Sequence, residues 1–135
     1  MFNKKIIGTD YLHRWHIIPR NRFFNIYLHH FIGDDNRLEL HDHPWNFVSI
    51  LLKGRLLETF QSEHNQRLHH GWLTSRYIPW LLPRYYHATH RHCFELPSAG
   101  PQSAWSLVFT GPRYRNWGFY RDGILIKTMT GESDE

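Results

Sequence analysis

Apolar and polar residues alternate along short segments of this chain, whereas the 3.6-residue period of an amphipathic helix is hard to find. These segments are rich in β-branched and aromatic residues and lie between clusters of Gly, Pro, Asn and Asp. That pattern is typical of an all-β sandwich or barrel. The expected strands are residues 23–31, 37–41, 46–52, 55–60, 89–96, 105–110 and 123–129.

The dipeptide Lys53-Gly54 separates two of the apolar runs and is interpreted as the tight turn of a hairpin, because Gly supplies the positive φ that such a turn needs. In the expected register Ser49 faces Glu58, and the two-residue period places Glu58 on the mostly apolar inner side. A slip of one residue would place Glu58 in solvent instead.

The chain is expected to form one domain, residues 1–135, with a frayed acidic tail at residues 131–135. No run approaches the roughly 20 apolar residues of a membrane-spanning helix, and the basic start leads into polar residues rather than an apolar signal core. We therefore expect a cytoplasmic protein without a membrane partner. The lone Cys93 excludes an intramolecular disulfide and a Cys-rich zinc site.

Histidine is unusually frequent, with 12 residues, and this surplus favours a metal site because imidazole is the commonest metal ligand in proteins. The formal net charge of +4 favours acidic partners. Basic residues near the start are Lys4, Lys5, Arg14, Arg20 and Arg22. A nucleic-acid accessory protein is therefore one hypothesis, although it rests on charge alone.

His41 and His43 are two residues apart, so on an extended strand their side chains point the same way with Cβ atoms ~6.5 Å apart. Two imidazoles at that separation can tilt onto one metal ion. Pro44 follows and should end the strand, which places the pair at the mouth of a barrel. A second His-x-His, His90 and His92, occurs later in the chain.

The segment from His41-Asp42-His43 to Gly54 resembles the first motif of the cupin superfamily, in which a His-x-His is followed by a Glu and then by a Gly in a turn. His41, His43 and Gly54 match that motif. Phe47 stands where the Glu is expected, and no carboxylate lies between Pro44 and Gly54. The resemblance implies a small double-stranded β-helix, or jelly-roll barrel, that holds one metal ion without that Glu.

The chain resembles more closely an uncharacterised cupin-like group of bacteria and phages, which brings no established reaction. The matching segments are residues 14–15, 24–29, 41–45, 54–58, 110–112 and 117–119.

The second cupin motif implies a third histidine ligand that follows a turn and precedes the end of a strand. His92 fits, because residues 93–96 complete a strand before the turn at Pro97. His90 has the same strand parity, and His87 lies nearer the turn at Pro83. Both stay alternatives to His92.

Three imidazoles with open positions suit one divalent ion of iron, manganese, nickel, copper or zinc, and the sequence does not choose among them. Glu58, if it points inward, is expected to be a replacement ligand or a catalytic proton-transfer group, because a buried carboxylate must be paired, metal-bound or protonated. Arg113 and Arg115 could grip a carboxylate or phosphate, although solvated loop charges are commoner. Several aromatic residues could line a pocket, pack in the core or form a homodimer interface: Trp45, Trp105, Trp117, Phe119 and Tyr120.

The leading hypothesis is a metal-dependent enzyme that acts on a small chelating substrate. Oxygenase chemistry like that of a non-haem iron dioxygenase comes first, and isomerisation or hydrolysis second. The alternative is a metal- or small-ligand-binding module without turnover, because one barrel supports many functions. A small-molecule partner is expected ahead of nucleic acid.

Overall fold

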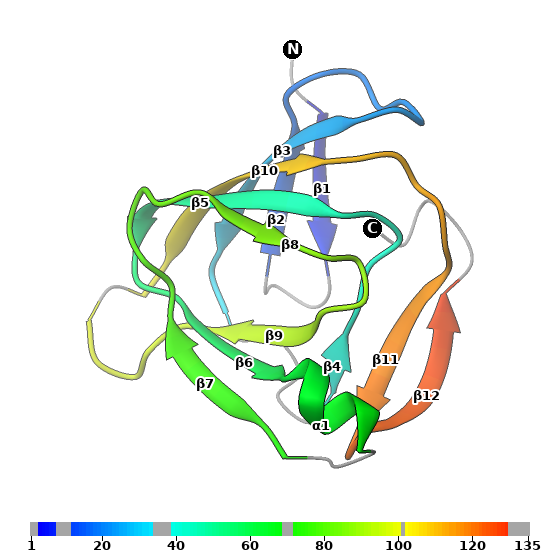
Figure 1. The fold of residues 1–135 in the computed structure, drawn as a ribbon. Helices are drawn as coiled ribbons and strands as arrows, with labels where there is room; N and C mark the ends of the chain where they lie inside the picture. The colour runs from blue at the N-terminus through cyan, green and yellow to red at the C-terminus, as the bar shows by residue number, and fades with distance from the viewer. Residues whose placement is uncertain (1–2, 8–11, 34–38, 69–71, 101, 130–135) are drawn as a thin grey trace.

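The computed structural model describes residues 3–7, 12–33, 39–68, 72–100 and 102–129, and the strands within them form two six-stranded sheets (Figure 1). Neighbouring strands of both sheets run antiparallel. The predicted all-β jelly-roll class is confirmed.

The first sheet has the strand order β1-β2-β3-β10-β5-β8. Its strands are β1 (Asn3–Ile7), β2 (Leu12–His16), β3 (Asn25–Phe31), β10 (Ala104–Thr110), β5 (Phe47–Gly54) and β8 (Arg84–Tyr86).

The second sheet has the order β12-β11-β4-β9-β6-β7. Its strands are β12 (Ile124–Met129), β11 (Trp117–Arg121), β4 (Leu40–His41), β9 (Arg91–Glu95), β6 (Leu57–Gln61) and β7 (Thr74–Tyr77). A short helix, α1 (Glu63–Arg67), lies between β6 and β7 in the chain, and none of the described helices is long and apolar enough to cross a membrane.

The core lies between the sheets, because β3 and β10 bury every second side chain. One apolar cluster consists of Leu12, Phe31, Leu51, Leu56 and Ala104. A second cluster consists of Tyr27, Trp45, Phe47, Tyr86 and Val108. The second cluster borders the histidines described below, so those imidazoles face hydrocarbon rather than bulk water.

The expected hairpin at Lys53-Gly54 is wrong, because β5 and β6 belong to different sheets. The chain crosses from one sheet to the other at Gly54, whose φ is +88°. A Cβ atom there would lie 2.3 Å from the carbonyl oxygen of Ser103, so the crossing requires glycine for space as well as for conformation. Sequence identified the turn residue but not the path of the chain after it.

The register built on that hairpin is wrong as well. Ser49 pairs with Val108 of β10 and Arg84 of β8, not with Glu58. Glu58 is nevertheless fully buried, as expected, because the two-residue alternation within β6 is independent of the strand it pairs with.

Five strands were not expected from the sequence: β1, β2, β7, β8 and β11. β7 is an edge strand with three exposed residues, and β8 has only three residues, so neither shows a clear apolar alternation. Of the predicted strand 37–41, residues 40–41 form β4. The predicted acidic tail, residues 131–135, lies outside the described residues.

Candidate metal centre

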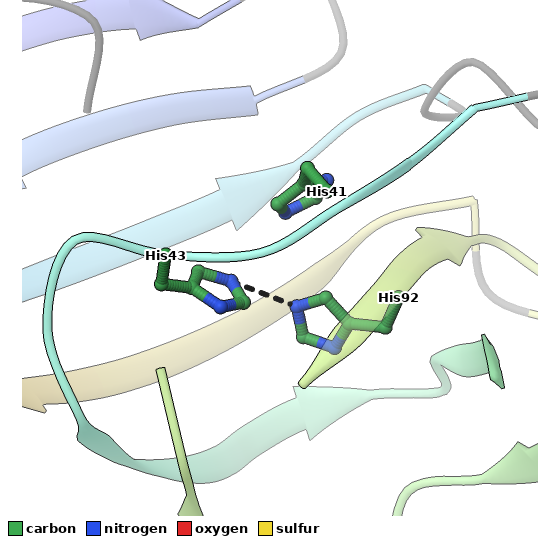
Figure 2. Close-up of side chains that lie close together, drawn as sticks. All are labelled: His41, His43 and His92. Atoms are coloured by element: carbon green, nitrogen blue, oxygen red, sulfur yellow. Dashed lines mark hydrogen bonds between the residues drawn. The ribbon is translucent and has the colours of Figure 1, made fainter. Parts of the chain in front are cut away.

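Three histidines from separate parts of the second sheet meet at one point (Figure 2). His41 ends β4, His43 lies in the bend that follows, and His92 lies on β9. His41 and His92 are paired across the β4–β9 ladder, so their side chains leave the same face of the sheet. One nitrogen from each of the three rings lies within 4.8 Å of the others.

His43 and His92 approach most closely, with 3.1 Å between their Nε2 atoms (Figure 2). Trp45 stacks against the His43 ring with centroids 5.8 Å apart, and Phe47 meets it edge-on at 4.6 Å. Phe47, the residue that stands at the position of the expected Glu, therefore forms an apolar wall beside the histidines.

Both of these imidazoles are deeply buried, with 3% of His43 and 1% of His92 exposed. Burial lowers the pKa of His43 well below its ordinary range, and the neighbouring His92 and His41 lower it further. Burial also lowers the pKa of His92 to about 3, against an opposing effect of Glu58. Both rings are therefore neutral near pH 7, which is the form that binds metal.

Glu58 lies behind His92, with its carboxylate completely buried. Its Oε2 is 2.5 Å from Nδ1 of His92 and 2.9 Å from Nε2 of His90. Its Oε1 accepts hydrogen bonds from Nε of Arg76 at 2.8 Å and from the Tyr86 hydroxyl at 3.4 Å. Both carboxylate oxygens are thus engaged.

Burial acts to raise the pKa of Glu58, but hydrogen bonds from His90 and His92 outweigh it and hold the pKa well below the ordinary range. The favoured state is an ionised Glu58 beside a neutral His92, because Arg76 supplies a full positive charge to the carboxylate.

The chain offers a second group of potential metal ligands in Glu58, His90 and His92. Two ligand atoms that bind one ion at ~2.1 Å and at right angles lie ~3 Å apart. The 2.5 Å between His92 and Glu58 is closer to a charge-assisted hydrogen bond, and Arg76 already neutralises the carboxylate. The cluster of His41, His43 and His92 therefore fits an ion better.

The two alternatives to His92 occupy different places. His90 contacts Glu58 and belongs only to the second group. His87 is exposed, its Nδ1 lies 2.9 Å from the Thr89 hydroxyl, and it belongs to neither group.

Asp42 secures the segment between His41 and His43, a role that sequence reasoning did not identify. Only 1% of this residue is exposed. Its carboxylate accepts hydrogen bonds from the Gly118 amide at 2.7 Å and the Tyr120 hydroxyl at 3.0 Å. A buried Asp needs hydrogen-bond partners, but the partners of Asp42 lie more than 70 residues away in the sequence. The local sequence therefore does not identify them.

Arg115 completes this support by pairing with Asp42 at 3.1 Å and donating to the His43 carbonyl at 2.9 Å. Its guanidinium therefore holds the bend, which is neither the solvated loop charge favoured from the sequence nor the alternative of gripping a ligand.

Among the aromatic residues singled out from the sequence, Trp117 and Phe119 contact His41, with ring centroids 6.2 Å away in each case. Trp45 packs on His43, Tyr120 binds Asp42, and Trp105 stacks on His30 of the first sheet. Within the described part of the chain, Nε1 of Trp117 and Nδ1 of His43 are buried without a hydrogen-bond partner. The histidine cluster is thus bordered by aromatic rings and carries polar nitrogens that a ligand could engage.

No protein-family model matches the sequence, and no curated protein matches it either. Solved structures do match. Hydroxypropylphosphonic acid epoxidase from S. wedmorenis superposes with a TM-score of 0.58 at 14% identity, over 79% of this chain and 55% of that one. Oxalate decarboxylase from Bacillus subtilis superposes with a TM-score of 0.58 at 13% identity, over 83% of this chain and 27% of that one. CapF with a tropolone inhibitor superposes with a TM-score of 0.60 at 8% identity, over 85% of this chain and 32% of that one.

The chain has a cupin fold. This chain spans about half or less of the length of those neighbours, and identities this low establish the fold alone. The epoxidase has also been solved with iron(II) and, in complex with substrate, with cobalt(II).

Proposed function

We propose that this protein binds one divalent transition-metal ion through His41, His43 and His92 and acts as a metal-dependent enzyme on a small chelating substrate. The observation that carries the proposal is the convergence of these imidazoles, of which the two deeply buried ones are neutral. Phe47, a hydrocarbon side chain, lies beside them. Three protein ligands leave coordination positions for substrate, and such open positions distinguish catalytic from structural sites.

A bound ion would supply a Lewis acid and a template for the substrate. The rings of Trp45 and Phe47 shield His43 from water, while Asp42 and Arg115 fix the bend that carries it. The catalytic proton-transfer role of Glu58, as acid or base, stays a prediction, and the lowered pKa of this residue favours a base over an acid near pH 7.

Oxygenase chemistry is the first reaction class that we propose, with isomerisation or hydrolysis second. The iron(II) form of the similar epoxidase supports iron as one metal that this fold can hold, and imidazole is a ligand that iron accepts. Membership of the bacterial and phage cupin-like group, a cytoplasmic location and a homodimer stay predictions.

The test is to purify the protein without a His tag, remove bound metal with a chelator and reload separate samples with iron(II), manganese(II) and zinc(II). Oxygen uptake is then followed with panels of small hydroxy and keto acids. Uptake that requires iron and substrate together supports an oxygenase. Tight binding of one metal without turnover of any substrate would favour the non-catalytic binding module instead.

The binding module is the second candidate function, because the two buried carboxylates next to the described histidines, Glu58 and Asp42, are both occupied by other hydrogen-bond donors. The nucleic-acid hypothesis loses one of its basic residues, since Arg14 is buried and its Nε donates to His29 at 2.9 Å.

A further inference from the structure

The contact between Glu58 and His92 determines which nitrogen of the imidazole carries the proton. Glu58 approaches Nδ1, whereas Nε2 points at His43 on the other side of the ring. The Glu58 carboxylate is paired with the guanidinium of Arg76 at 2.8 Å, and an ionised carboxylate can only accept hydrogen bonds, so Nδ1 of His92 is the donor. A neutral imidazole has one proton, and Nε2 of His92 therefore presents its lone pair to the cluster.

The assignment of the His92 proton also determines which nitrogen of the neighbouring His43 ring is protonated. Because Nε2 of His92 is an acceptor, the 3.1 Å contact requires Nε2 of His43 to donate when no metal is bound. A hydrogen-bond sequence thus runs from His43 through His92 to Glu58. To hold a metal ion through Nε2, His43 would have to carry its proton on Nδ1 instead, whereas His92 already presents a lone pair at Nε2.

Other residues hold Glu58 in the orientation in which it accepts the hydrogen bond from Nδ1 of His92. Arg76, on edge strand β7, has no acceptor atom, so its 2.8 Å contact fixes Oε1 as an acceptor. His90 meets the other carboxylate oxygen, Oε2, and Tyr86 reaches Oε1 from β8. Strands of both sheets therefore fix one carboxylate rotamer.

We propose that Glu58 is a positioning residue, which acts through His92 by fixing its Nδ1–H tautomer and aiming its Nε2 lone pair at the metal site. This inference rests on the proposed function, since it assigns His92 as a ligand. A carboxylate that orients a metal-binding histidine typically improves metal affinity by about 10- to 100-fold. Among the described residues no such partner serves Nδ1 of His43, so of these two rings only His92 is oriented in this way.

The substitution Glu58→Gln tests the proposal because Arg76 remains a donor. Its Nε attracts the amide oxygen to the Oε1 position, and the amide NH₂ then occupies the Oε2 position and donates to Nδ1 of His92. The tautomer of His92 should invert to Nε2–H, which places a proton where the metal would bind. We expect metal affinity to fall by about 10- to 100-fold.

The tautomer is read from the ¹⁵N chemical shifts of the imidazole in the metal-free protein. The unsubstituted protein should show a protonated Nδ1 and a lone pair on Nε2, and Glu58→Gln should show the reverse. Glu95→Gln, on the same strand as His92 but with the opposite parity, is the matched control and should change neither tautomer nor zinc affinity.

Protonated Nε2 in the unsubstituted protein would overturn the proposal, as would an unchanged tautomer in a folded Glu58→Gln variant. If that variant does not fold, the measurement on the unsubstituted protein still decides the assignment. Because the tautomer is measured without metal, a protein that shows Nδ1–H but binds no zinc, iron or manganese would contradict the proposed function while supporting the tautomer assignment.

Discussion

His41 lies directly opposite His92 across the β4–β9 ladder. This pairing joins two histidines that are far apart in the sequence, and the bend after β4 brings His43 to the same point. β4, β9 and the bend after β4 therefore each supply one histidine to the candidate centre. Each of these histidines can be tested by its own substitution.

His92→Ala should weaken metal binding more than the other substitutions in the second His-x-His region, because it removes one of three proposed ligands. We expect a loss larger than the about 10- to 100-fold that follows from removing an orienting partner. His90→Ala should cause a smaller loss through Glu58, and the exposed His87→Ala should cause none. Titrations of metal-free protein with zinc provide the comparison, and a larger effect of His87→Ala would refute the ligand assignment.

Asp42→Ala should destabilise the protein by about 2–4 kcal/mol, because the Gly118 amide, the Tyr120 hydroxyl and Arg115 lose a buried acceptor. Glu39→Ala is the matched control, since Glu39 pairs with Arg121 at the surface and should cost less than about 1 kcal/mol. Urea denaturation measures both free energies of unfolding. Equal costs would show that Asp42 does not hold the bend.

The metal-free protein should lose stability as the pH falls. The pKa of His92 is about 3 in the folded protein against an ordinary 6.5, so between these values the unfolded chain binds a proton that the folded protein excludes. The free energy of unfolding should therefore decrease from pH 7 toward pH 3. Above pH 6.5 the contribution of His92 to this free energy should be constant. The low pKa of Glu58 adds a further loss below its ordinary 4.5. Urea denaturation across this range should show the decline, and rising stability on acidification from pH 7 to 5 would contradict it.

Phe47→Glu should place a carboxylate beside His43, at the position where the cupin motif carries its Glu. The metal-free variant should be less stable than the parent, because the core gains an unpaired charge. Metal should raise the stability of Phe47→Glu more than that of Phe47→Leu, because Phe47→Leu keeps the site apolar. Thermal unfolding with and without zinc tests this, and an identical metal-induced shift in both variants would argue against an ion next to His43.

The regular strands of this fold could be predicted because local alternation reports which side chains point inward. β3 and β10 show a strict two-residue burial pattern and lie within or close to the predicted ranges. Alternation also gave the buried orientation of Glu58 correctly. It could not report that the chain changes sheets at Gly54, because a glycine turn fits a hairpin and a crossing equally well.

The candidate site also combines features that the local sequence predicts with features that depend on the topology of the chain. The spacing of His41 and His43 is local, so the sequence alone indicated that these two side chains could meet. The contacts of Glu58 with Arg76 and of Asp42 with Gly118 join distant segments, and their formation depends on how the two sheets are assembled. Sequence could identify Glu58 as unusual, but it identified neither the role of Asp42 nor the partners of either acid.

The most direct test of the central claim is the metal content of the protein purified without a tag. Elemental analysis should find about one transition-metal ion per chain in the parent protein and in His87→Ala. The double variant His41→Ala/His43→Ala should fold and contain almost none. Equal metal content in the double variant and the parent would contradict the account.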